Sequence, residues 1–198
     1  MVDRPLRIVT DDLSGPEIRA LLEEHLRSMH ALSPPESVHA LDLAKLRQPG
    51  ITFWTAWDDG VLVGCGALKE LDSRHGEIKS MRTPQALRRR GAARAMLAHI
   101  LDVARSRAYE RLSLETGSSD AFAPAQRLYE SFGFSRCGPF GDYGPSRHST
   151  FMTLSLGGPD LAEWPACGDD SHRTAASPPG RVQAAVAQPA GLSRSRQA

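Results

Sequence analysis

The chain has 198 residues, of which 40% are hydrophobic and 24% are charged, a composition typical of a soluble globular protein with one ordinary domain and some length to spare. Its formal net charge of +1 argues against a protein that mainly coats nucleic acid or an anionic membrane surface. The chain has three widely spaced cysteines without a CxxC pair, and its histidines are scattered, which disfavours a metal site. It has no apolar run typical of a signal peptide or a membrane span. Together with the cysteine usage, this favours a cytoplasmic protein.

The first half of the chain predicts two helices and four strands. A short strand is expected over residues 6–10, and a helix opens after Ser14 at Pro16, in the order typical of a helix start. Residues 33–46 begin as a proline-rich loop and continue as a second, less regular helix. Apolar residues at 51–57 and 61–71 flank Asp58-Asp59-Gly60, which predicts a β-hairpin. A further strand over 76–83 ends at Pro84.

The second half alternates helices and strands. After Gly91, apolar residues share one helical stripe as far as Ala108, and a strand follows over 111–116. The next helix, within 122–134, is expected to end at Gly133 in a left-handed conformation, and the last strand covers 148–156. Residues 76–116 should therefore form a right-handed β-α-β crossover. The fold class is α+β, with a mixed, mostly antiparallel sheet of six to seven strands and about four flanking helices.

Residues 157–198 have a different composition from the rest. They are rich in Pro, Gly, Ala, Ser and Arg and show almost no apolar periodicity. Because such a segment cannot bury enough apolar surface to offset the entropy of ordering, we expect a domain over residues 1–156 and a disordered tail over 157–198.

Three consecutive arginines, Arg88, Arg89 and Arg90, precede Gly91 at the start of the third predicted helix. The first turn of a helix leaves backbone N–H groups without intrahelical partners and is locally positive. Gly91 has no side chain to block an approaching anion, and Ala93 keeps the next turn narrow. The segment therefore predicts a cradle for a phosphate or another oxyanion.

Two other interpretations of the arginines remain open at this stage. They can form a basic turn that only solvates the helix start, or a nucleic-acid or nuclear-localisation patch. The second is disfavoured because no aromatic residues and no second basic cluster accompany them. A dinucleotide site at Gly64 and Gly66 is weaker still, because that GxG lies within a predicted strand and no helix follows it.

Two segments resemble one enzyme superfamily. The sequence RRRGAA, with Arg88, Gly91 and Ala93, resembles the Q/R-x-x-G-x-G/A pyrophosphate loop of the GNAT superfamily of N-acetyltransferases. About forty residues later, RLYESFGF resembles the L-Y-x-x-x-G-F segment of the same superfamily. The order of predicted elements agrees from about residue 6 to residue 156. Further segments resemble a bacterial branch whose substrates are mostly not defined.

The resemblance implies acetyl-coenzyme A as co-substrate and no metal. It places the pyrophosphate on the loop and first helical turn, and the pantetheine arm along the strand that precedes the loop, where the two parallel strands should splay apart. The cofactor-binding residues implied in this way are Met81, Arg82, Thr83, Arg88, Arg89, Arg90, Gly91, Ala92, Ala93 and Arg94.

The resemblance also implies two catalytic residues. Glu77 lies eleven positions before Arg88, a placement similar to that of the glutamate base in related enzymes, with Glu115 as its rival and a solvated strand glutamate as the alternative. Tyr129 matches the general acid that protonates the leaving thiolate, although a buried core tyrosine would fit the pattern too. A departure from the superfamily is Phe122, where many members carry asparagine; Ser118, Ser119 or Asp120 can substitute.

The acceptor is expected to be a primary amine of a small molecule, peptide or protein. Glu36, His39 and Asp42 are candidates for attracting a cationic amine, and Tyr143 and Arg147 for binding an acidic one. No nucleic acid or membrane partner is expected, and a homodimer is compatible with the resemblance. The alternative function is a non-catalytic sensor or interaction module that binds acyl-coenzyme A.

Overall fold

The computed structural model describes residues 6–32 and 43–157. In chain order its strands and helices are β1 (Arg7–Thr10), α1 (Pro16–Leu32), α2 (Leu43–Leu46), β2 (Ile51–Asp58), β3 (Val61–Asp72), β4 (His75–Arg82), α3 (Ala92–Ser106), β5 (Arg111–Gly117), α4 (Ala123–Glu130), β6 (Ser135–Cys137) and β7 (Ser149–Ser155), with short 3-10 turns at Gln85–Leu87 and Asp120–Phe122.

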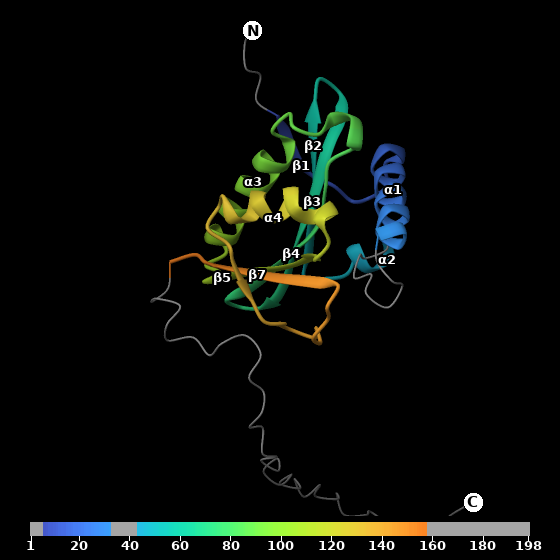
Figure 1. The fold of residues 1–198 in the computed structure, drawn as a ribbon. Helices are drawn as coiled ribbons and strands as arrows, with labels where there is room; N and C mark the ends of the chain where they lie inside the picture. The colour runs from blue at the N-terminus through green and yellow to red at the C-terminus, as the bar shows by residue number, and fades with distance from the viewer. Residues whose placement is uncertain (1–5, 33–42, 158–198) are drawn as a thin grey trace, which may run out of the picture. The chain divides into compact units, whose positions relative to one another are not determined.

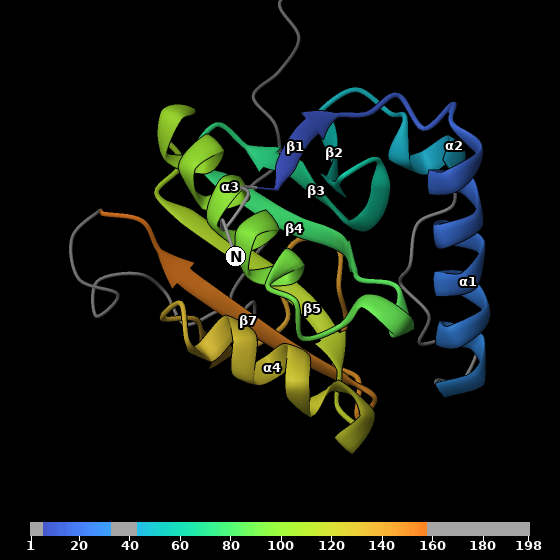
Figure 2. The same ribbon diagram turned by 90° about the horizontal axis from the view of Figure 1, so that it is seen from above.

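The strands form one seven-stranded sheet in the order β1-β2-β3-β4-β5-β7-β6. Among the strands of the described residues, only β4 and β5 pair in parallel, and α3 connects them, so the predicted β-α-β crossover is confirmed. Helices α3 and α4 pack with one face of the sheet around a core that includes Met96, Leu97 and Leu114. Helices α1 and α2 pack around a second core with Ile18 and Leu46 (Figures 1 and 2). The α+β fold class is thus confirmed.

Two glycines in β3 let α3 lie close to the sheet. A Cβ at Gly66 would stand 2.7 Å from Met81 Sδ and 2.9 Å from Met96 Cγ, both closer than van der Waals contact allows. A Cβ at Gly64 would stand 3.2 Å from the Arg82 carbonyl oxygen. The GxG pattern is therefore explained by close packing inside the sheet rather than by dinucleotide binding.

A β-bulge in β4 shapes the region next to the loop. Lys79 pairs with Ala67 of β3 and Arg82 pairs with Cys65, so β4 has one more residue than β3 in this interval, and Ser80 has a φ of +53°. The parallel ladder with β5 ends at the pair Ile78–Leu114. Beyond that pair, the residues of β4 have no ladder partner in β5, which confirms the predicted separation of the two strands.

The remaining predictions agree with the structure except at the short elements. Gly133 has a φ of +92°, as expected, although α4 already ends at Glu130. The three-residue strand β6 was not predicted, because it is too short to show an alternating pattern. Residues 33–42, which are most of the predicted loop and second helix, lie outside the described residues. The described part of that prediction is the single turn α2. The predicted tail likewise lies outside them, apart from Gly157.

Candidate active site

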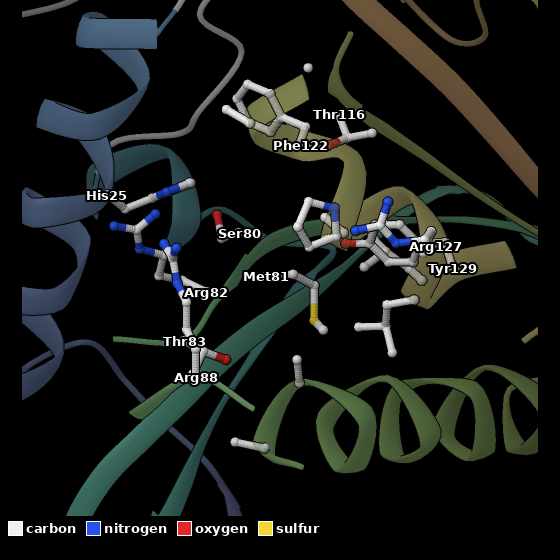
Figure 3. Close-up of a pocket in the computed structure, with 18 of the residues that line it drawn as sticks. His25, Ser80, Met81, Arg82, Thr83, Arg88, Thr116, Phe122, Arg127 and Tyr129 are labelled. Carbon is white, nitrogen blue, oxygen red and sulfur yellow. The ribbon is translucent and has the colours of Figure 1, made fainter. Parts of the chain in front are cut away.

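A cleft of about 820 Å³ opens where β4 and β5 separate. This volume is within the range common for small-molecule sites. Its walls come from α1, β4, the loop before α3, the first turn of α3, the end of β5 and α4 (Figure 3). The lining includes His25, Met29, Lys79, Ser80, Met81, Arg82, Thr83, Arg88, Arg89, Gly91, Ala92, Ala93, Arg94, Glu115, Thr116, Gly117, Phe122, Arg127, Tyr129 and His148.

The N-terminus of α3 forms one end of this cleft. Its N-cap residue, Gly91, has a φ of +87°, and no side chain caps the exposed N–H groups of the first turn. Arg89 is also left-handed, with a φ of +66°, which turns the loop sharply before the helix. No acidic residue lies in the first turn of α3. Uncapped amides with neighbouring arginines are the arrangement that binds an oxyanion.

Most of the residues predicted for the coenzyme line the cleft together. They come from the strand, the loop and the helix start: Met81, Arg82, Thr83, Arg88, Arg89, Gly91, Ala92, Ala93 and Arg94. Arg90 is exposed and does not belong to the lining. The guanidinium of Arg94 lies 4.8 Å above the centre of the Phe132 ring, so this arginine joins the start of α3 to the segment that follows α4.

The residue that follows β4 contributes a buried hydroxyl to the cleft lining. Thr83 Oγ1 is shielded from solvent and has no hydrogen-bond partner. A buried, unsatisfied hydroxyl costs about 1–3 kcal/mol, which a polar ligand at this position would recover. The observation fits a ligand that runs along β4.

Tyr129 extends from α4 to the cleft and is only 6% exposed. In Figure 3 it lies across the pocket from His25 and Arg82, with Met81 between them. Burial raises the pKa of Tyr129 above its ordinary value, and the nearby carboxylate of Glu115 raises it further. The phenol therefore stays protonated at neutral pH and can donate a hydrogen bond into the cleft.

Glu77 is 2% exposed and does not line the cleft. Its Oε1 accepts hydrogen bonds from Lys79 Nζ at 2.9 Å and from the Tyr143 hydroxyl at 2.5 Å. Lys69 Nζ lies 3.9 Å from its Oε2. The carboxylate thus lies beneath Lys79, which does line the cleft, and its predicted role as a base stays a prediction.

The other carboxylate considered for that role, Glu115, belongs to the cleft lining itself. It lies near the end of β5, two residues beyond Ser113, which pairs with Glu77. Since alternate residues of a strand share a face, Glu115 and Glu77 are on the same side of the sheet.

Several lining residues were not found by sequence reasoning. His25 and Met29 of α1, Lys79 and Ser80 of β4, and His148 before β7 complete the wall opposite the α3 cradle. Met29 belongs to the apolar stripe of α1, and no motif surrounds His25, so the sequence did not mark either residue as part of a site.

The residues predicted to bind the acceptor are only partly described. Tyr143 binds Glu77 and Lys79, and Arg147 Nε lies 3.1 Å from His148 Nε2. Glu36, His39 and Asp42 lie outside the described residues.

The described residues contain neither a metal-binding cluster nor a helix that could span a membrane. Residues 6–32 and 43–157 contain no group of three or more His, Cys, Asp or Glu side chains placed to hold a metal ion. Within the same residues, no helix is both long enough and apolar enough to cross a membrane.

Comparison with known proteins agrees with this geometry. The model of the Acetyltransferase (GNAT) family matches residues 18–134. The chain belongs to the GNAT family. It is 59% identical over 151 residues to the uncharacterized N-acetyltransferase YsnE of Bacillus subtilis (strain 168), covering 76% of this chain and 100% of that one. It is 51% identical over 149 residues to the uncharacterized N-acetyltransferase YedL of Escherichia coli (strain K12), covering 75% and 94%.

A solved GNAT structure shares the fold. The crystal structure of a GNAT family acetyltransferase from Elizabethkingia anophelis with acetyl-CoA bound superposes with a TM-score of 0.55 at 18% identity, over 76% of this chain and 97% of that one. The predicted family and enzyme class are thereby confirmed: the chain is an acyltransferase of the GNAT family.

One departure from the common GNAT pattern has a structural explanation. Phe122 replaces the asparagine of many members and packs on Gly117, where an added Cβ would stand 2.3 Å from the Phe122 ring. Both residues line the cleft. The absence of a side chain at Gly117 therefore leaves room for the Phe122 ring at the end of β5.

Proposed function

We propose that this GNAT protein is an N-acetyltransferase that moves the acetyl group of acetyl-coenzyme A to a primary amine by direct attack in a ternary complex. The acceptor is a small molecule or a peptide or protein amine. The observation that carries the proposal is the juxtaposition, in one cleft, of the uncapped α3 N-terminus, Tyr129 and Glu115.

The cleft fits the coenzyme at both of its polar parts. The first-turn amides of α3 and the side chains of Arg88, Arg89 and Arg94 suit a pyrophosphate, because they combine N–H donors with positive charge. Main-chain groups of Met81 and Thr83, free of the β5 ladder, suit the amides of a pantetheine arm. When bound, acetyl-coenzyme A supplies the acetyl thioester. Holding it beside the amine lowers the barrier by removing most of the entropy cost of their encounter.

The amine must lose a proton before it attacks. An unperturbed amine with a pKa near 10.4 and a glutamate near 4.3 differ so much that direct transfer is uphill by about 8 kcal/mol. Glu115 faces the cleft, so it can attract the cation and receive its proton through water. Glu77 has no such access and carries hydrogen bonds from Lys79 and Tyr143. We therefore assign the base to Glu115 and a positioning role to Glu77.

The leaving sulfur gains negative charge and needs a donor. Tyr129 is the buried hydroxyl at this wall of the cleft. Because burial raises its pKa, complete proton transfer to a thiolate is less favourable than for an exposed phenol, but the hydrogen bond it donates is stronger in a dry site. We infer that Tyr129 stabilises the departing thiolate mainly by this hydrogen bond.

This mechanism needs only side chains and amides of the chain, so we propose that it operates without a metal. We further propose that the protein acts in the cytoplasm and that residues 1–156 suffice for activity.

The decisive experiment measures thiol release from acetyl-coenzyme A with panels of amino acids, polyamines, aminoglycosides and peptides. In parallel, saturating acetyl-coenzyme A should raise the melting temperature and shift the amide resonances of residues 88–94. Binding without thiol release for any amine would support the acyl-coenzyme A sensor instead. Absence of both binding and release would reject either function.

A further inference from the structure

We propose that the acceptor amine carries a carboxylate, and that Arg82 of β4 and His25 of α1 bind it. The inference rests on the proposed function in one respect only, because it takes the cleft to be the place where an amine meets acetyl-coenzyme A. It goes further by naming the chemical class of the acceptor: a zwitterion of the amino-acid type rather than a polyamine or an aminoglycoside.

The bulge in β4 brings the arginine to the correct face. Arg82 pairs with Cys65 and Lys79 with Ala67. Cys65 and Ala67 both belong to the core that packs with α1, so the two cations of β4 lie on the α1 side of the sheet. Without the extra residue at Ser80, residues 79 and 82 would point to opposite faces. The irregular strand thus places positive charge beside α1.

Arg82 is held firmly at one edge of its guanidinium. Its Nη2 donates to Glu24 Oε1 at 2.8 Å and to Ser28 Oγ at 3.0 Å, both on α1. The side chain is only 10% exposed, yet its Nε is buried without a hydrogen-bond partner. Since Arg82 lines the cleft, this group is anchored on one side and keeps an unsatisfied donor on the other.

His25 provides a second unsatisfied nitrogen in the same wall. Its Nδ1 is buried and has no hydrogen-bond partner, and the residue lines the cleft. Figure 3 shows His25 and Arg82 on the same side of the pocket, across from Tyr129. Burial and the charge of Arg82 lower the pKa of His25 to about 4, so the ring is neutral at physiological pH. A neutral imidazole can donate one hydrogen bond without adding a second buried charge.

A carboxylate satisfies both groups at once. Its two oxygens accept from the arginine Nε–H and from an imidazole N–H, and each unsatisfied buried donor costs about 1–3 kcal/mol until it is paired. A polycation would instead meet the positive charges of Arg82 and Lys79. Glu115, in the lining contributed by β5, suits the ammonium group of the same acceptor. The cleft therefore offers opposite charges to the two ends of a zwitterion.

The experiment compares matched acceptors with the full chain. Thiol release is measured with the standard L-amino acids and with the amine that each gives when its carboxylate is removed, such as phenylalanine and phenethylamine. We expect at least one amino acid to have a kcat/KM more than tenfold above its amine. Arg82→Gln and His25→Phe should each reduce the ratio of kcat/KM for the amino acid to kcat/KM for its matched amine about tenfold or more, since a charge-assisted hydrogen bond contributes about 1.5–3 kcal/mol.

Two controls test whether the preference for a carboxylate arises from Arg82 in the cleft. Arg47→Gln removes an arginine outside the cleft, whose Nη2 donates to the Leu13 carbonyl at 2.8 Å, and should leave the preference for the carboxylate unchanged. The resemblance implies a coenzyme contact for Arg82, so the affinity for acetyl-coenzyme A is measured by calorimetry in Arg82→Gln, and it should fall much less than the preference for the carboxylate. A large loss of that affinity would show that Arg82 binds a phosphate of the coenzyme and would overturn the inference.

A binding measurement keeps the inference testable without turnover. With coenzyme A present, the imidazole resonances of His25 should shift on titration with amino acids and not with the matched amines, and Arg82→Gln should abolish the shift. Such a shift without thiol release would reject the acetyltransferase and keep the carboxylate site. Thiol release that is equal for both members of every pair would keep the enzyme and reject the site.

Discussion

Lys79 Nζ lies 2.9 Å from Glu77 Oε1, and the Tyr143 hydroxyl donates to the same oxygen at 2.5 Å. The carboxylate predicted to be the general base therefore holds a cation and a phenol in place beneath the cleft. Lys79 Nζ in turn lies 5.3 Å from the centre of the Tyr143 ring, so the three side chains form one connected unit around the buried carboxylate. A carboxylate held in this way orders the wall of the site, and its role as a base stays a prediction.

The first prediction separates the two glutamates by isosteric variants. Glu115→Gln should lower kcat/KM by about 10²-fold or more and abolish the acidic limb of its pH profile, because general bases contribute 10²–10⁴-fold. Glu77→Gln should lower the free energy of unfolding by about 2 kcal/mol, since it leaves Lys79 without its carboxylate, and reduce kcat less than tenfold. Urea unfolding and pH–rate profiles provide the measurements. A larger rate loss in Glu77→Gln than in Glu115→Gln would show that Glu77 is the general base.

The second prediction concerns the donor to the leaving sulfur. Tyr129→Phe should lower kcat by about 10²-fold, because it removes a hydrogen bond that strengthens as the sulfur becomes negative. The affinity for acetyl-coenzyme A and the melting temperature should change little, since the ring keeps its edge-to-face contact with Phe134, at 5.8 Å between ring centres. Thiol-release kinetics and calorimetry test both parts. Unaltered turnover would reject the role of Tyr129.

The third prediction compares two glycines that have similar backbone angles and similar free space but lie in different parts of the fold. Gly91 has a φ of +87° and Gly60, in the β2–β3 hairpin, a φ of +81°, and a Cβ at either would meet nothing within 4 Å. Alanine at each position should therefore impose a similar backbone cost of about 1 kcal/mol. Only Gly91→Ala should weaken acetyl-coenzyme A binding, by about tenfold, because it distorts the uncapped turn. Equal affinities for the two variants would show that this turn does not hold the coenzyme.

The cradle could be predicted from the sequence because everything that makes it is local. Gly91, the arginines before it and the apolar stripe after it lie within a few residues of each other, and the strand–loop–helix order fixes where the amides point. The splay of β4 and β5 was likewise expected from the resemblance and agrees with the end of the ladder at Ile78.

The wall that faces the acceptor could not be predicted, because it depends on register and on distant pairs. The bulge at Ser80 places Arg82 on the same face as Lys79, and residues 77–82 contain no glycine or proline that would predict it. Tyr143 reaches Glu77 across 66 positions of sequence, and Arg82 reaches Glu24 across 58. Such contacts follow from how the elements pack, which propensity and periodicity do not specify.

The last prediction is a pH dependence of stability that arises away from the cleft. His75 is buried, with Nε2 at 2.8 Å from Ser113 Oγ and Nδ1 at 3.1 Å from Arg111 Nη2. Arginine can only donate, so Nδ1 must accept and the ring must be neutral, with its proton on Nε2. Burial, together with the charge of Arg111, lowers the pKa of His75 to about 4 from its ordinary value of 6.5.

Whether stability rises or falls with pH depends on which state, folded or unfolded, binds the proton at His75. Between pH 6.5 and about 4, the unfolded chain protonates His75 and the folded chain does not, so stability falls as the pH decreases through this window. From pH 7.5 to 5.0, wild type should lose about 1–2 kcal/mol more than His75→Gln, whose amide keeps both hydrogen bonds without titrating. Urea unfolding at the two pH values measures the difference. Equal losses would mean that Nδ1 is already protonated in the folded protein, and that Arg111 does not donate to it.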